Sequence, residues 1–147
     1  MKWLLDTNVV WETIRPRPDP AVVSWIEAHP LDDLGISIVT MAELQEGAAS
    51  AGGEGKDRLT QWLKNIVVPS FGERTLPLTL SILVESVRLS RMLAAERAIH
   101  RAADLLIAAT ARWHGLVVVT RNLRDFAPTK VAVYDPWTGT AYNAEKP

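Results

Sequence analysis

The sequence predicts an α/β fold with a central, mainly parallel sheet. Short apolar segments of strand length alternate along the chain with longer segments of helical periodicity. The apolar segments are nearly continuous, which is typical of strands covered by helices on both faces of a parallel sheet. The 147 residues suffice for one domain with a sizeable core, and no linker or repeat interrupts them. We therefore expect a single domain over residues 1–147.

Five strands are expected, each a short apolar segment next to turn-forming or charged residues. The first stops at Asp6. The third is weakened by Pro77, which has no backbone N–H to donate. The fourth, a run of Leu and three Val, is the clearest in the chain. The predicted strands cover 2–5, 35–39, 74–78, 116–119 and 130–134, and the last is an edge strand followed by a polar tail.

The helices expected between these strands have recognisable starts. Asp19 followed by Pro20 is typical of an N-cap and a first helical position, and Thr40 with Glu43 three residues later matches a capping box. The last helix is apolar on all sides over 105–109, which indicates burial on most of its surface. The predicted helices cover 20–28, 40 to the Gly-rich segment at 51–53, 56–67 with a break before Pro69, 79 through 93, and 102–113 with Gly115 as its stop.

Composition excludes several classes of function. The chain has no cysteine, so disulfides, thiolate metal sites and cysteine nucleophiles are ruled out. The start of the chain lacks the apolar stretch of a signal peptide, because Asp6 follows only three apolar residues. No segment is apolar enough to span a membrane. We expect a soluble cytoplasmic protein with no membrane partner.

The net charge of −1 conceals an uneven distribution. Residues 1–54 contain three basic and nine acidic side chains, whereas residues 86–124 contain seven arginines and two acids. Separate acidic and basic regions can concentrate a metal ion in one place and phosphate in another. The alternative interpretation is a set of solvated arginines on helix faces.

Acidic residues follow the predicted strands at their carboxyl ends, where open parallel sheets bind ligands. Asp6 comes directly after the first strand, and Glu43 lies in the first helical turn after the second. Asp125 follows the fourth strand by a few residues. The three carboxylates are therefore expected at one rim of the sheet.

Asp104 is expected at the same rim for a geometric reason. It lies near the start of a helix that precedes the fourth strand, so this helix runs antiparallel to the sheet. The helix from Asp104 to Trp113 covers about 15 Å, and the strand that follows covers about 13–16 Å. The two lengths nearly cancel, which returns the chain to the edge it left.

Several carboxylates at one place repel one another, and a divalent cation relieves that repulsion. Oxygen ligands without cysteine or a suitably spaced histidine pair favour Mg²⁺ or Mn²⁺ over Zn²⁺. Such an ion activates water for phosphodiester hydrolysis. Each acid also has a structural interpretation: Asp6 and Glu43 as helix caps, Asp104 as a partner of its helix dipole, and Asp125 as an exposed loop residue.

The ordered motifs of this chain resemble those of the PIN-domain family, and in particular the VapC-like ribonuclease toxins of toxin–antitoxin systems. The resemblance covers nearly the whole chain. It rests on Leu4–Val9 (LLDTNV), Thr40–Leu44 (TMAEL), Ala103–Ala111 (ADLLIAATA), Val119–Asn122 (VTRN) and Val133–Trp137 (VYDPW).

The resemblance implies a three-layer α/β/α fold and an Mg²⁺- or Mn²⁺-dependent endoribonuclease that cuts RNA, often tRNA or rRNA, as a homodimer inhibited by a small antitoxin protein. Carried over by position, Asp6 and Asp104 are the principal metal ligands. Glu43 is a further ligand, directly or through water, or orients the attacking water. Thr7 and Thr120 support the cluster through their hydroxyl groups.

The chain departs from the family pattern at Asn122, where many relatives have a fourth acid. Asp125, three residues later, is the alternative source of that charge. Two competing hypotheses remain open: a PIN domain that only binds partners, and a receiver-like signalling module. The receiver hypothesis requires an acceptor Asp after a middle strand, and the segment Pro77–Thr79 has none.

Overall fold

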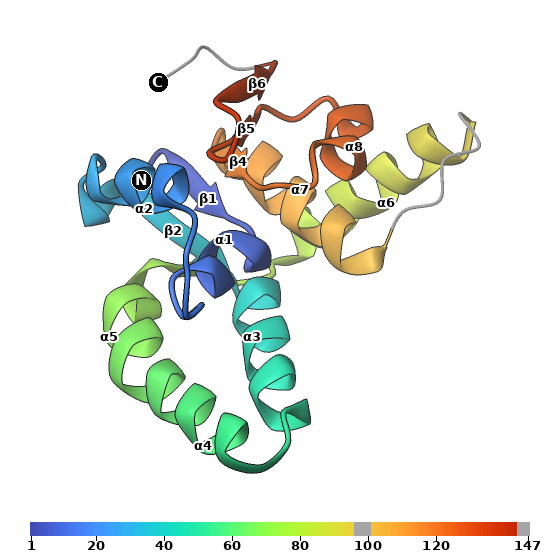
Figure 1. Ribbon diagram of the computed structural model, residues 1–147. Coiled ribbons are helices and arrows are strands. Elements are labelled where there is room, and N and C mark those ends of the chain that lie inside the picture. The colour runs from blue at the N-terminus through green and yellow to red at the C-terminus, as the bar shows by residue number, and fades with distance from the viewer. Residues whose placement is uncertain (96–100, 144–147) are drawn as a thin grey trace.

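A six-stranded sheet forms the centre of the computed structural model, which describes residues 1–95 and 101–143 (Figure 1). The strand order is β3-β2-β1-β4-β5-β6, and every pairing is parallel except that of β5 with β6. The strands are β1 (Trp3–Leu5), β2 (Leu34–Ser37), β3 (Thr75–Leu76), β4 (Val117–Val119), β5 (Val133–Asp135) and β6 (Thr140–Tyr142). The predicted α/β class with a mainly parallel sheet is confirmed.

The helices cover both faces of this sheet, as expected for a three-layer arrangement (Figure 1). Side chains of successive strand residues point to opposite faces, so Trp3 and Leu5 pack in one core cluster and Leu4 packs in the other. The α-helices are α1 (Thr7–Glu12), α2 (Pro20–Glu27), α3 (Ile38–Ser50), α4 (Gly53–Trp62), α5 (Val68–Phe71), α6 (Leu80–Ala95), α7 (Ala102–His114) and α8 (Leu123–Phe126).

Helix α7 is buried on most of its surface, as its all-round apolar sequence predicts. Ile107, Ala108, Ala109 and Ala111 have no exposed surface. The helix ends at Gly115, whose φ of 65° is in the left-handed region that favours glycine after a helix. This confirms the predicted stop and sends the chain back into β4.

The start of α3 differs from the prediction. The N-cap is Ser37, whose hydroxyl accepts a hydrogen bond of 3.0 Å from the backbone N–H of Thr40. The helix thus begins at Ile38, inside the segment predicted as a strand, because a short apolar run fits either structure. The capping box of Thr40 and Glu43 was wrong, and Glu43 lies in the helix interior with its carboxylate available for other contacts.

Three further differences concern segments with weak or mixed signals. The helix expected to break before Pro69 continues from α4 through a π-helical segment (Leu63–Val67) into α5. The wider hydrogen-bond spacing of a π segment accommodates a proline that cannot donate an N–H. The predicted polar tail contains β6, and the short helix α8 follows β4. The short helix α1 after β1 agrees with the capping interpretation of Asp6. Residues 144–147 of that tail lie outside the described residues.

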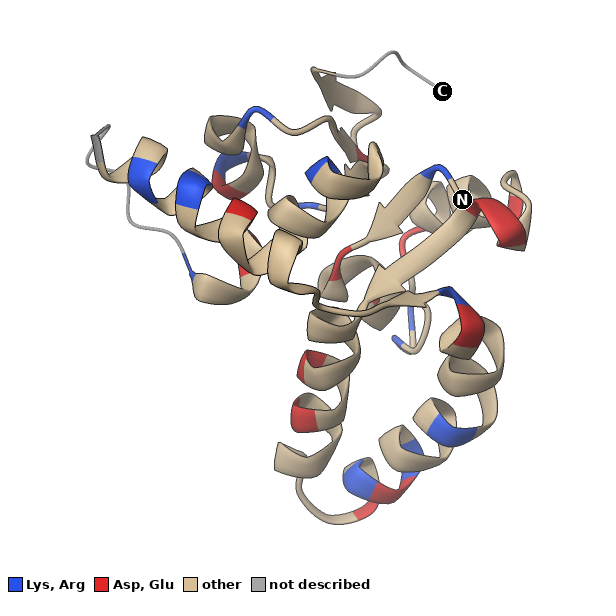
Figure 2. Cartoon of the chain, turned by 180° about the vertical axis from the view of Figure 1, so that it is seen from behind, with Lys and Arg blue, Asp and Glu red and all other residues tan. Residues whose placement is uncertain are grey.

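Three arginines of the basic region, Arg88, Arg101 and Arg112, form ion pairs. Arg112 and Arg88 both contact the carboxylate of Glu85, at 3.0 and 3.5 Å. Glu96 and Arg97, which contributed to the predicted asymmetry, lie outside the described residues. Figure 2 shows that α3, in contrast, carries acidic positions and no basic ones. Within residues 1–95 and 101–143, no helix has the length and apolar character needed to cross a membrane.

Candidate active site

The carboxyl ends of β1 and β4 bring Asp6 and Thr120 together. Leu5 and Val119 are register partners in the sheet, so the residues that follow them leave the sheet side by side. The hydroxyl of Thr120 donates a hydrogen bond of 2.6 Å to Asp6 Oδ2 although 114 positions separate the two residues. The strand pairing itself therefore sets the position of the first carboxylate.

The Asp6 side chain is held by further donors from the start of α1. The backbone N–H of Thr7 donates to Asp6 Oδ1 at 2.8 Å, and Asn8 Nδ2 donates to Asp6 Oδ2 at 2.8 Å. The first of these contacts makes Asp6 the N-cap of α1, so the capping interpretation is true of this residue. Capping does not exclude a second role, because each carboxylate oxygen has two lone pairs.

The electrostatic environment of Asp6 disfavours its charged form. Only 4% of the residue is exposed, and this burial is the main cause that raises its pKa to about 6. Hydrogen bonds from Thr120 and Thr7 oppose the shift, whereas the charges of Asp104 and Glu43 add to it. Asp104 and Glu43 are thus each close enough to Asp6 to repel its charged form.

Glu43 reaches the same place from α3. Its Oε2 accepts a hydrogen bond from the Thr7 hydroxyl, and its Oε1 forms an ion pair with Arg101 at 3.6 Å. Arg101 precedes α7 and is largely exposed, while Glu43 is mostly covered. One carboxylate oxygen is therefore oriented by the residue after Asp6, and the other faces a cation at the mouth of the site.

Asp104 completes a hollow of about 280 Å³ at the rim of the sheet. It lies in the first turn of α7 with 7% of its surface exposed. The expected return of α7 and β4 to one edge is what the structure shows. The hollow is lined by Asp6, Thr7, Asn8, Trp11, Glu43, Arg101, Asp104 and Asn122.

The structure places Asn122 and Asp125 differently. Asn122 borders the carboxylate hollow, and its backbone N–H donates to the Thr120 hydroxyl at 2.9 Å. Asp125 is exposed in α8 and lines a neighbouring hollow with Arg121 and Arg124. The structure therefore brings Asp6, Glu43 and Asp104 together with Asn122, and leaves Asp125 beside that group.

Two functional candidates were not selected from the sequence. Asn8 bridges the site: its amide nitrogen also donates to the Thr120 hydroxyl at 3.0 Å, and its Oδ1 accepts from the backbone N–H of Arg121 at 3.2 Å. The spacing of two residues after Asp6 was a usable signal for it. Arg101 had no such signal, because its ion pair with Glu43 depends on how α3 and α7 meet.

The donor set fits a hydrated magnesium or manganese ion. Among the described residues, no three His, Cys, Asp or Glu side chains are grouped tightly enough to enclose a metal. Mg²⁺, however, retains several waters and commonly binds through one or two carboxylates rather than in a closed protein cage. The buried carboxylate oxygens of Asp6 and Asp104, whose repulsion a cation would relieve, have this character.

The fold and the carboxylate hollow together define a PIN-type nuclease architecture, and sequence comparison agrees. The model of the PIN domain family matches residues 3–131, so the chain belongs to this family. Toxin FitB of Neisseria gonorrhoeae is 37% identical over 135 residues, covering 91% of this chain and 97% of that protein. VapC ribonuclease Y4jK of Sinorhizobium fredii is 34% identical and covers 91% and 96%, respectively.

Solved structures of similar proteins have the same fold. The crystal structure of FitAcB from Neisseria gonorrhoeae contains a chain that superposes with a TM-score of 0.87 at 37% identity, covering 92% of this chain and 98% of the other. DNA-bound VapBC from Salmonella typhimurium contains one with a TM-score of 0.80 at 25% identity, covering 92% and 98%. Membership of the PIN family favours a nuclease or a related binding domain over the receiver-like hypothesis.

Proposed function

We propose that this protein is a divalent-metal-dependent endoribonuclease and the toxin of a toxin–antitoxin pair, built as one nuclease domain. The observation that carries the proposal is the convergence of Asp6, Glu43 and Asp104 on one hollow at the carboxyl rim of the sheet. The similarity to a protein called a VapC ribonuclease and to Toxin FitB supports the class of reaction and the biological role. The substrate is RNA in the cytoplasm, with tRNA or rRNA as the first candidates.

The residues of the hollow have separate roles in this proposal. Asp6 and Asp104 hold Mg²⁺ or Mn²⁺, and Glu43 contributes a further ligand or orients the attacking water. Thr120 and Thr7 keep the carboxylates of Asp6 and Glu43 in place. The ion, when bound, polarises a phosphoryl oxygen and lowers the pKa of a bound water. Asn122 and Asp125 are the candidates for the fourth position of the site.

The proposed partners are an antitoxin and a second copy of the chain. Relatives of known structure include FitAB and VapBC complexes, and another, from Klebsiella pneumoniae, is called a toxin–antitoxin complex. Helix α6 exposes Leu80, Leu83, Val84 and Val87, which lie on one helical face and are 43–78% exposed. Such a contiguous apolar stripe is characteristic of a protein–protein interface, and we assign it to the homodimer that the family resemblance implies.

The activity is tested with purified protein and a labelled cellular RNA fraction. We expect cleavage with Mg²⁺ or Mn²⁺ and none after addition of EDTA. Asp6→Asn is expected to abolish cleavage while circular dichroism shows an intact fold, and Asp57→Asn, an exposed acid on α4, serves as the matched control. Undiminished cutting by the Asp6 variant rules out the proposed site. Absence of metal binding by calorimetry favours a PIN domain that only binds partners.

The homodimer is tested separately by light scattering coupled to size-exclusion chromatography. Val87→Glu places a charge in the apolar stripe of α6 and is expected to yield a monomer. Ala21→Glu adds the same charge at an exposed position of α2, in the helical layer on the other face of the sheet, and is expected to leave the dimer intact. A monomeric wild-type protein, or a dimeric Val87 variant, contradicts the assignment of this face.

A further inference from the structure

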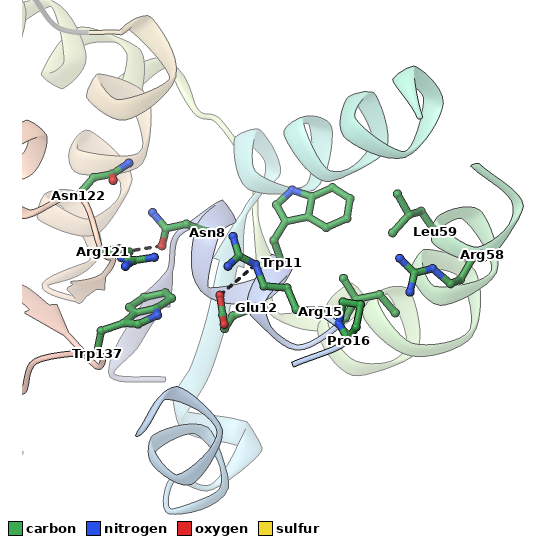
Figure 3. Close-up of a pocket in the computed structure, with 11 residues that line it drawn as sticks. Asn8, Trp11, Glu12, Arg15, Pro16, Arg58, Leu59, Arg121, Asn122 and Trp137 are labelled. Carbon is green, nitrogen blue, oxygen red and sulfur yellow. Dashed lines mark hydrogen bonds and ion pairs between the residues drawn. The ribbon is translucent and has the colours of Figure 1, made fainter. Parts of the chain in front are cut away.

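A second hollow of about 480 Å³ adjoins the carboxylate hollow (Figure 3). Asn8, Trp11 and Asn122 border both spaces, so the two are continuous along the rim of the sheet. The volume is within the range of about 300–1,000 Å³ typical of ligand sites. None of the roles assigned above to the carboxylate site requires this second space.

Two tryptophans stand on opposite walls of the second hollow (Figure 3). The Trp11 ring stacks on Trp62, with 5.3 Å between the ring centroids. It also lies against Gly47, where a Cβ atom would be only 2.6 Å from the indole. Trp137 lies on the other side, anchored by a hydrogen bond of 2.8 Å from its backbone N–H to Asp135 Oδ1. The hollow therefore has positioned aromatic walls.

Three exposed arginines surround these rings. The guanidinium of Arg121 lies 5.4 Å from the centre of the Trp137 ring, which is within the range of a cation–π contact. Arg15 and Arg58 stand on the opposite wall (Figure 3). The one acid of the lining, Glu12, is buried, pairs with Arg15 Nε at 3.3 Å and accepts a 2.9 Å hydrogen bond from the backbone N–H of Asp19. The accessible charge of the hollow is therefore positive.

We propose that this hollow, defined by Trp11, Trp137, Arg15, Arg58 and Arg121, binds an unpaired nucleotide of the RNA next to the scissile phosphate. The proposal rests on the ribonuclease function proposed above and adds a substrate subsite to it. Indole faces stack on unpaired bases of any sequence, and arginines bind the flanking phosphates. An apolar peptide segment would use the rings but not the exposed guanidinium groups beside them, so single-stranded RNA is the occupant that matches both features.

Binding is tested with a fluorescent single-stranded RNA of about eight nucleotides, in EDTA so that no cleavage occurs. Trp137→Leu is expected to raise the Kd about tenfold or more, and Trp137→Phe, which keeps an aromatic face, to recover most of the affinity. Arg58→Gln is expected to raise the Kd about fivefold at low salt. Lys64 lies in the π-helical segment that continues α4, beside a different hollow. Lys64→Gln therefore removes one positive charge close to Arg58 in the sequence but outside the proposed subsite, and is expected to leave the Kd unchanged.

A probe with abasic ribose positions separates stacking from a general loss of structure. Wild type and Trp137→Leu are expected to bind the abasic strand equally, because neither can stack on it. The proposal is overturned if wild type and Trp137→Leu bind the normal strand with equal affinity. It is also overturned if Trp137→Leu loses the same affinity for the normal and the abasic strand, or if Arg58→Gln and Lys64→Gln have equal effects. If the hollow instead accepts the antitoxin, these variants change antitoxin affinity and leave RNA affinity intact, which also overturns it.

The failure of this proposal is distinguishable from failure of the nuclease assignment. Cleavage that depends on metal and on Asp6, with no change of KM in the Trp137 and Arg58 variants, rejects the subsite alone. Binding that depends on Trp137 and Arg58, without metal-dependent cleavage, rejects the nuclease and retains an RNA-binding hollow. With both correct, Trp137→Leu raises KM more than it lowers kcat.

Discussion

The two helical layers pack against the same sheet with different side chains. The layer of α6 and α7 is aliphatic apart from Phe126 and uses small residues, with Ala108, Ala109 and Ala111 fully buried. The opposite layer is rich in large aromatic residues, in which Trp25 packs against both Trp3 and Tyr134 at centroid distances of 5.3 and 5.5 Å. Small residues let α7 approach the sheet closely, whereas bulky rings leave hollows around α1 and the α3–α5 arm.

The two layers supply different acids to the site. Asp104 lies on the closely packed helix α7, only a few residues before its fully buried segment. Glu43 lies on α3, which runs away from the sheet before α4 and α5 return the chain toward β3 (Figure 1). Each layer thus contributes one carboxylate to the same hollow.

The largest expected effect separates these two carboxylates. Asp104→Asn is expected to lower RNA cleavage about 1,000-fold, because loss of a principal anionic ligand removes several kcal/mol of stabilisation from the transition state. Glu43 already pairs with Arg101 and acts on the ion directly or through water, so Glu43→Gln is expected to lower cleavage about tenfold. Single-turnover cleavage rates at saturating Mn²⁺ measure both, and equal losses would show that Glu43 contributes as much as Asp104.

The second prediction concerns the pH dependence of stability in metal-free protein. The folded-state pKa of Asp6 is raised from 3.8 to about 6. Below pH 3.8 the group is protonated in both states. Between pH 3.8 and 6 the unfolded chain releases the proton first, so the free energy of unfolding falls by about 2–3 kcal/mol and then levels off.

Urea unfolding of wild type and Asp6→Asn in EDTA, over pH 4.5–7.5, isolates this contribution because the variant lacks the titrating group. Addition of Mn²⁺ at pH 7 is expected to raise the stability of wild type only, since the ion binds the folded, ionised site. Parallel pH profiles for the two proteins would show that Asp6 does not titrate in this range.

The third prediction compares the packing of the two layers directly. Ala108→Val adds two methyl groups to the filled aliphatic layer and is expected to lower the free energy of unfolding by about 2 kcal/mol. Ala48→Val makes the same change at a buried position of α3 that borders a hollow, and is expected to cost less than about 1 kcal/mol. Chemical denaturation gives both values, and a reversed order would contradict the packing comparison.

The smallest effect is expected at Asp125. An exposed carboxylate beside the hollow acts through solvent and is screened, so Asp125→Asn should lower cleavage about threefold. Asn122→Ala, which alters the hollow itself, tests the other candidate for the fourth position. A loss of activity at Asp125 as large as that at Asp104 would mean that α8 moves toward the acids when substrate binds.

The parts of the fold that depend on hydrophobic periodicity and on the lengths of helices and strands could be predicted from the sequence. Alternation of strands and helices predicted the sheet, and the near-equal lengths of α7 and β4 placed Asp104 at the rim occupied by Asp6. The start of α3 could not be predicted, because Ile38 and Val39 fit a strand as well as a helix. The prediction also missed β6 (Thr140–Tyr142), a short polar strand at the edge of the described sheet that pairs with β5.

Contacts within the site were less accessible to prediction than its location. Asn8 and Arg101 act through partners that are far away in the sequence, at Thr120 and Glu43. Such contacts depend on side-chain directions set by packing, which no local pattern encodes. The second hollow likewise arises from segments around Trp11, Arg58 and Trp137 that meet only in the folded chain.

The pairing of β1 with β4 also has a consequence for the order in which the protein becomes competent during its synthesis. The chain leaves the ribosome from its amino terminus, and Asp6 cannot receive the Thr120 hydroxyl until nearly all of the polypeptide has emerged. The carboxylate of Asp104 arrives late for the same reason. In the proposed function, the site needs Asp6, Asp104 and Thr120 together, so it is incomplete on the nascent chain and cannot cut RNA until most of the sequence has been synthesised.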